Sequence, residues 1–180
     1  MPTRLEKKPP QLRVVSAPAK PDLRLAVEPF YVIAKELPPL FKQHWREFGR
    51  DREDVLLDPD WDAYMADAIA GRLRVLTARD GDALVGYVFN IVGSHRHYRS
   101  TLHGMVDMYW LDRRYRGGWA WVKIFRRNDE EMKKAGVVRM NVAENLLARG
   151  VRGRLMRVIF KRLGYKAVDV TYRKMLQKDD

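Results

Sequence analysis

The chain has 180 residues, enough for one domain whose hydrophobic core needs no covalent staple. It contains no cysteine, which excludes disulfides, thiolate metal sites and a cysteine nucleophile. No apolar run approaches the roughly 20 residues of a membrane span, and the basic N-terminus lacks the apolar core of a secretory signal. We therefore expect a cytoplasmic protein with no membrane partner.

The positive charge lies in one part of the chain. The net charge is +12, and residues 1–112 contribute none of it, with 16 basic and 16 acidic residues. Residues 113–180 contain 19 basic and 7 acidic residues. Such a one-sided field attracts anions, which include phosphorylated cofactors, nucleic acids and acidic proteins.

The composition divides the chain into an arm and a domain. Residues 1–22 are basic, rich in proline and poor in large apolar side chains, so we expect a flexible extension. Residues 23–180 are predicted to form a single domain. Alternating apolar residues predict its strands at 23–27, 72–78, 83–92, 102–111, 137–143 and 165–175. Helical spacing predicts helices after residue 28, at 61–70, at 120–134 and at 147–163.

Turn and cap residues set the predicted boundaries. Pro38 and Pro39 interrupt the first helical segment, and Asp58-Pro59-Asp60 is a typical helix start. Asp80-Gly81 is a hairpin signal between two strands, and residues 94–100 form a polar, basic loop. Strands and helices in this order predict a mixed α/β sheet.

The stretch Met108–Lys123 has the order of elements that is typical of an anion-binding turn. It contains the end of a strand, a cationic turn with paired glycines, and the beginning of a helix. Glycines let backbone N–H groups approach an anion, and a helix N-terminus adds partial positive charge. Arg113, Arg114 and Arg116 surround the turn, which favours a ligand that carries a diphosphate. The alternative is a surface turn whose arginines are only solvated.

This order of elements, with Tyr115-Arg-Gly-Gly-Trp-Ala120 between strand and helix, resembles the GCN5-related N-acetyltransferase (GNAT) superfamily. Arg162-Leu-Gly-Tyr165 is similar to the family's common ending of its last helix. Members encoded by bacteriophages look especially similar, which would place the protein in a host cytoplasm. The resemblance implies a GNAT-like mixed central sheet of about six to seven strands flanked by about four helices. It also implies an acetyl-CoA-dependent N-acetyltransferase that acts on a primary amine and uses no metal.

The glycine turn departs from the family's pattern of Gln/Arg-x-x-Gly-x-Gly/Ala. Gly118 and Ala120 match the last two positions, whereas Tyr115 stands at the first. The family's longer form fits only if one residue is missing between Gly117 and Gly118. Either the tightened loop still binds the diphosphate, or the cradle has lost its ligand.

The resemblance implies the positions that contact acetyl-CoA. The cofactor would lie across the splayed end of the strand at 102–111, its pantetheine arm on the strand backbone and its pyrophosphate on the glycine turn. A polar contact would follow the next strand. The implied residues are Tyr109, Trp110, Leu111, Arg114, Tyr115, Arg116, Gly117, Gly118, Trp119, Ala120 and Asn145.

Strand periodicity supplies the catalytic candidates. Strict alternation puts five side chains on one face of the strand: His103, Met105, Asp107, Tyr109 and Leu111. The family's frequent base falls on Met105, which cannot accept a proton, so the neighbours Asp107 and His103 become the candidates. The alternatives are an Asp107 ion pair and a structural His103. The family's acid falls on Phe160, so either Tyr109 or water would protonate the thiolate, or the thiolate would leave unassisted.

The acceptor stays open between a polyamine-like molecule, a protein lysine or N-terminus, and an amine-bearing modified nucleotide. The positive charge favours an acidic or phosphate-bearing acceptor. A second hypothesis is a catalytically inactive protein of the same fold that binds nucleic acid or an acidic protein through its basic C-terminal third. A third hypothesis is a structural component of a virion or complex. His95 and His97 could share a metal only with a third ligand, which the sequence does not indicate.

Overall fold

The computed structural model describes residues 22–48, 56–144, 151–171, 174 and 176. In these ranges one five-stranded sheet has its strands in chain order, and only the last pair is parallel. The strands are β1 (Arg24–Glu28), β2 (Leu73–Asp80), β3 (Ala83–His95), β4 (Tyr98–Leu111) and β5 (Val137–Val142). The helices are α1 (Phe30–Ile33), α2 (Leu37–Phe48), α3 (Trp61–Ile69), α4 (Gly118–Lys134) and α5 (Val151–Arg162), with a 3₁₀ turn η1 at Arg113–Tyr115.

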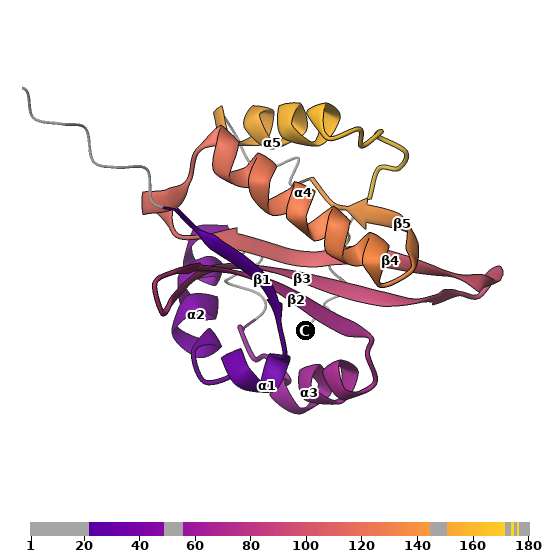
Figure 1. The fold of residues 1–180 in the computed structure, drawn as a ribbon, viewed down its shortest axis with the longest axis horizontal. Coiled ribbons are helices and arrows are strands. Elements are labelled where there is room, and N and C mark those ends of the chain that lie inside the picture. Colours follow the sequence, from indigo (N-terminus) through magenta and orange to yellow (C-terminus); the bar gives the residue numbers. More distant parts are fainter. Residues whose placement is uncertain (1–21, 49–55, 145–150, 172–173, 175, 177–180) are drawn as a thin grey trace, which may run out of the picture.

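The helices form a layer on each face of the sheet (Figure 1). α4 and α5 cover one face, where their apolar side chains pack against Val88, Val106 and Leu111. α1, α2 and α3 cover the other face and enclose Phe89 and Trp110. The mixed α/β fold expected from the sequence is therefore confirmed. None of the helices in the described ranges has the length and apolar character needed to cross a bilayer.

Local capping and turn residues explain several of the element boundaries. Pro38 and Pro39 occupy the first turn of α2, where a missing N–H donor does no harm. Asp60 caps α3 by accepting a hydrogen bond from the Ala63 N–H at 2.8 Å. Gly81 in the β2–β3 turn and Gly136 after α4 have positive φ angles of 57° and 84°, which favour glycine.

The strand expected at 165–175 is absent from the part of it that the structure describes, so the sheet has fewer strands than predicted. Residues 165–171, together with 174 and 176, are irregular. The alternating valines that suggested a strand are solvent-exposed, at 74% for Val168 and 62% for Val170. Because neither valine finds a face to bury, the alternation gives this segment no reason to pair.

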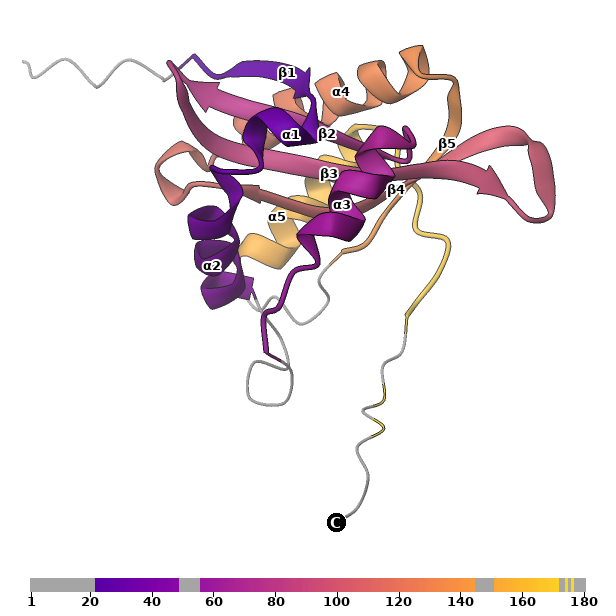
Figure 2. The same ribbon diagram turned by 90° about the horizontal axis from the view of Figure 1, so that it is seen from below.

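The β3–β4 hairpin is longer than expected. Residues 94–100 were predicted as a loop, but β3 continues to His95 and β4 begins at Tyr98. The two strands pair as far as His95↔Tyr98, so only a tight turn is left at the end. The hairpin consequently extends beyond both helical layers (Figure 2).

A buried amide pair joins α4 to the sheet. Asn90 on β3 and Asn128 on α4 have no exposed surface, and each donates to the other's side-chain carbonyl at 2.8 and 3.0 Å. Asn90 also donates to the carbonyl oxygens of Arg74 and Val88 at 3.1 and 3.3 Å. The pair fixes the position of α4 along the sheet, because no shifted register satisfies both amides.

Candidate functional site

A β-bulge in β4 carries Asp107. Phe89 of β3 pairs with Met108 and the next residue, Asn90, pairs with Val106, so Asp107 is the extra residue on β4. A bulge bends its strand and redirects the side chain that it carries. Asp107 is exposed, yet the surrounding protein desolvates its carboxyl and raises its pKa.

The last two strands of the described sheet, β4 and β5, separate beside this bulge. β4 and β5 pair from Leu102↔Val137 to Val106↔Val142, where β5 ends. β4 continues to Leu111, so residues 107–111 have no strand partner on the β5 side among the described residues. Backbone N–H and C=O groups that face such a gap need partners, which an extended polar ligand can supply.

The bulge corrects the expected strand face. Val106 packs on the α4–α5 face, but Met108 packs on the α1–α3 face, although strict alternation would put them together. Beyond the bulge, Tyr109 and Leu111 lie on the α4–α5 face. Asp107 lies on the opposite face, near Tyr64 of α3; burial, then the charge of Asp107, raises the pKa of Tyr64 to about 12. The sequence had suggested that Asp107 and Tyr109 share one face of the strand, and the structure shows that they do not.

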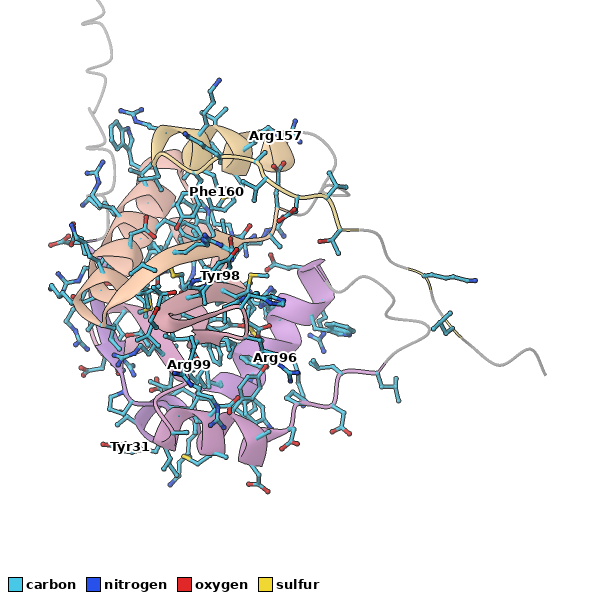
Figure 3. All side chains as sticks on the ribbon, turned by 90° about the vertical axis from the view of Figure 1, so that its right-hand side faces the viewer. Tyr31, Arg96, Tyr98, Arg99, Arg157 and Phe160 are labelled. Carbon is cyan, nitrogen blue, oxygen red and sulfur yellow. The ribbon has the colours of Figure 1, made fainter. Side chains whose placement is uncertain are left out.

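Tyr109 stands in an aromatic cluster between β4, α4 and α5. Its ring meets Phe125 edge-on at 5.2 Å between centroids and Phe160 at 6.3 Å. Burial, with a smaller contribution from Glu144, raises its pKa to about 12, so the hydroxyl keeps its proton at neutral pH. Phe160 is buried, and Figure 3 labels it on α5. Tyr109 of β4 thus places a phenol ring beside Phe160 of α5.

The glycine turn leads directly into α4. The helix starts at Gly118, with Gly117 as an extended N-cap residue that makes no side-chain cap. The N–H groups of Gly118, Trp119 and Ala120 therefore point out of the helix end without intrahelical partners. Tyr115 braces the turn by donating its hydroxyl to Asp80 at 2.6 Å.

The arginines of the turn have different roles. Arg114 is exposed and forms a two-nitrogen contact with Asp112, at 3.2 and 3.0 Å. Arg113 is exposed. Arg116 differs from the expectation, because its side chain is turned inward: it pairs with Glu47 of α2 at 2.6 Å and donates to the Leu111 carbonyl.

The backbone N–H of Arg116 also has a partner, the Arg113 carbonyl at 3.3 Å. Arg116 therefore ties the turn to α2 rather than facing a ligand. The Leu111 carbonyl, expected to contact the pantetheine arm, already accepts the Arg116 guanidinium. Trp110 is 1% exposed, so only its backbone could meet a ligand.

One pair beside the turn was not predicted. Trp119 in the first turn of α4 is 62% exposed, and the Arg162 guanidinium at the end of α5 lies 4.8 Å from its ring centroid. A flat, exposed indole with a cation over it offers a surface for another aromatic ring beside the helix N-terminus. No spacing pattern predicts this contact, because the two residues are far apart along the chain.

The structure does not bring His103 to the bulge. His103 lies four residues before Asp107, about 13 Å along an extended strand. Its ring stacks with His95 at 5.5 Å, and its Nε2 lies 3.1 Å from the Thr101 hydroxyl. Asn145, the other polar candidate, lies outside the described residues. Within the described ranges no three histidine, aspartate or glutamate side chains could hold a metal together.

Comparison with known proteins gives matches in structure alone. No protein-family model and no curated protein sequence matches the chain. Eighty-seven percent of the chain aligns with all of a ribosomal-protein-alanine N-acetyltransferase from Brucella melitensis biovar Abortus 2308, at 16% identity and a TM-score of 0.61. The same share aligns with all of a GCN5-related N-acetyltransferase from Ralstonia eutropha JMP134, at 13% identity and a TM-score of 0.65.

A third structure is a predicted acetyltransferase with acetyl-CoA from Clostridium acetobutylicum. The alignment covers 86% of this chain and 97% of that one, at 12% identity and a TM-score of 0.62. These similarities give the bacteriophage-type resemblance no support. The chain has the fold of the GCN5-related N-acetyltransferases.

Proposed function

We propose that this protein is a member of the GNAT superfamily that transfers an acetyl group from acetyl-CoA to a primary amine. The observation that carries the proposal is a succession of three features on and just after β4: a bulge with a desolvated carboxyl, a strand segment with no described partner on the β5 side, and a glycine turn that begins a helix. Each feature alone is common. Because they follow one another within residues 107–118 of this fold, the pyrophosphate and the pantetheine arm of acetyl-CoA would have binding partners that lie side by side.

The residues present fit the cofactor. The N–H groups of Gly117, Gly118, Trp119 and Ala120, with Arg113 and Arg114 near them, suit a pyrophosphate. The backbone of residues 108–110, which pairs with β3 but has no strand partner on the β5 side in the described part of the chain, suits the amides of a pantetheine arm. Acetyl-CoA, when bound, supplies the activated acetyl group as a thioester. The adenine ring would find an aromatic surface in Trp119, over which Arg162 already lies.

Asp107 is the proposed base. An amine must lose a proton before it can attack a carbonyl carbon, and a carboxylate accepts that proton better when its pKa is raised toward neutrality. Desolvation raises the pKa of Asp107, and its face of β4 is the one that α3 and Tyr64 adjoin. An acceptor amine would thus approach from the α1–α3 side, directly or through a water molecule. His103 is too distant to share this role.

Tyr109 is the proposed acid. It is protonated at neutral pH, and it lies on the opposite face of β4, beside Phe160. A hydroxyl there can donate a proton to a leaving thiolate. The acceptor itself is proposed only as an amine on a molecule that tolerates a positively charged enzyme. A protein N-terminus is one candidate, since a structural neighbour is named as an enzyme for ribosomal-protein alanine.

Calorimetric titration with acetyl-CoA tests the proposal. We expect micromolar binding to the full chain, weaker binding as salt rises, and no binding by Gly118→Glu, whose carboxylate would repel the pyrophosphate. Arg126→Gln is the matched control, because it changes the charge of α4 by the same amount on its exposed side. Equal affinity of Gly118→Glu and the parent protein would refute the cradle. Absence of binding by the parent at millimolar cofactor would refute the function.

A further inference from the structure

The end of the β3–β4 hairpin is a positively charged projection with no role in the proposed acetyl transfer. We define it as the hairpin tip, residues 93–103. It extends past both helical layers in Figure 2, and Figure 3 looks onto it, with Arg96, Tyr98 and Arg99 labelled together. All three side chains are exposed.

The charge of the hairpin tip is of one sign. No acidic residue occurs in the sequence between Asp82 and Asp107. Arg96 and Arg99 lie in the tip, and Arg139 of β5 lies beside it, 5.5 Å from the Tyr98 ring centroid. Within the described ranges, none of these arginines forms an ion pair with a carboxylate. Because these positive charges are not neutralised by ion pairs there, they are available to an anionic partner.

The hairpin tip also holds a group of aromatic rings. Tyr98 is 52% exposed and stacks with His103 at 5.7 Å between centroids. His95 lies 5.3 Å from Tyr98 and 5.5 Å from His103, and His97 lies 5.3 Å from His95. Desolvation and the charges of Arg139 and His95 lower the pKa of His103, so its ring is neutral at neutral pH. Stacked and partly exposed rings such as Tyr98 and His103 offer faces to a further planar ring.

A groove begins at these rings and runs along the outer edge of β5. Its volume is about 710 Å³, within the range of sites that hold small ligands. Its lining includes the cations Arg139 and Lys166 beside the rings of His95 and His103, and Asn141 adds an amide that can both donate and accept. Of the carboxylates that line it, Asp129 already accepts the Tyr165 hydroxyl at 2.5 Å. The other is Asp169.

We propose that the hairpin tip and the adjoining groove bind single-stranded nucleic acid. Phosphates would meet Arg96, Arg99 and Arg139, and bases would stack on the ring group and enter the groove. Single strands are bound by this combination, because each unpaired base presents a face to aromatic side chains while the backbone follows a basic surface. An acidic protein would use the arginines but not the rings. A duplex would hide the faces of its bases from them.

Fluorescence anisotropy with labelled 20-nucleotide oligonucleotides tests the proposal on the full chain. Single-stranded RNA and DNA are compared with a duplex of the same sequence and with polyglutamate. We expect single strands to bind at least tenfold more tightly than either competitor. Arg96→Ser/Arg99→Ser should lower the slope of log affinity against log salt by about 1.4, since each phosphate contact with a single strand contributes about 0.7.

Tyr98→Ala separates stacking from charge. It should weaken single-strand binding roughly 5- to 100-fold without changing the salt slope, whereas Tyr98→Phe keeps the affinity. The charge-matched control is Lys35→Ser/Lys42→Ser, on exposed positions of the α1–α2 region. Polyglutamate or duplex binding as tight as single-strand binding would overturn the proposal, and so would an equal loss in the lysine control or no loss in Tyr98→Ala. Acetyl-CoA affinity, measured in each variant, reports separately on the proposed acetyltransferase and should not change.

Discussion

The Asn90–Asn128 pair gives the sharpest test of how the sheet holds α4. Asn128→Val removes two buried hydrogen bonds, each worth about 1 kcal/mol, and leaves the Asn90 carbonyl buried without that partner. The unsatisfied acceptor adds about 1 kcal/mol or more, so the free energy of unfolding should fall by about 3 kcal/mol. Asn90→Val should cost a similar amount. Both losses lie within the 5–15 kcal/mol stability of a typical domain, so the variants remain folded.

The double variant distinguishes a coupled pair from two independent residues. If each asparagine is costly mainly because its partner is left unsatisfied, Asn90→Val/Asn128→Val should lose about 3 kcal/mol rather than about 6. Urea unfolding followed by tryptophan fluorescence measures all three variants, with the slope against urea as a check on two-state behaviour. Asn141→Val, on an exposed position of β5, serves as the control and should change stability by less than about 0.5 kcal/mol. Additive losses would refute the reasoning.

Three further predictions concern charge. Asp107→Asn should lower turnover in a thiol-release assay with an alanine-initiated peptide and leave the acetyl-CoA affinity unchanged, whereas full activity would exclude Asp107 as the base. The variant should not lose stability at pH 7, because a carboxyl whose pKa is raised in the folded state destabilises the fold when it is ionised above that pKa. Burial lowers the pKa of His44 to about 4, so the unfolded chain binds one more proton than the folded chain between about pH 6.5 and 4. Urea unfolding should therefore show the free energy of unfolding falling by up to about 3 kcal/mol over that interval in the parent and in the His97→Gln control, but not in His44→Gln. Glu47→Gln should lower the free energy of unfolding by about 2–3 kcal/mol and weaken acetyl-CoA binding, because it removes the carboxylate that pairs with the Arg116 guanidinium beneath the turn. Unchanged values would mean that α2 does not support the glycine turn.

Local signals predicted the fold well where one residue decides the backbone. Asp60, Gly81 and Gly136 act at their own positions, and each marked a boundary that the structure confirms. The segment at 165–175 shows the opposite case. Its alternating valines favour a strand, but a strand also needs a neighbour to pair with and a face to bury, and neither is encoded locally. The conformation of such a segment therefore depends on its tertiary contacts.

The candidate site was predictable in position and not in orientation. The glycine turn and the strand before it were found from spacing, and the structure places them end to end. The inward turn of Arg116 was not foreseeable, because its partner Glu47 lies far away along the chain. The same holds for Trp119 and Arg162. Contacts between distant segments leave no periodic trace in the sequence.

The bulge in β4 explains how one short strand segment could serve both sides of a reacting thioester. Asp107 and Tyr109 are two residues apart, so an unbroken strand would point them to the same face. The extra residue at the bulge turns Asp107 toward Tyr64 and leaves Tyr109 against Phe125. The Asp107 carboxyl thus lies on the α1–α3 side and the Tyr109 ring on the α4–α5 side. In the proposed reaction the base meets the incoming amine and the acid meets the departing thiolate, so the amine would approach from the α1–α3 side and the thiolate would leave on the α4–α5 side.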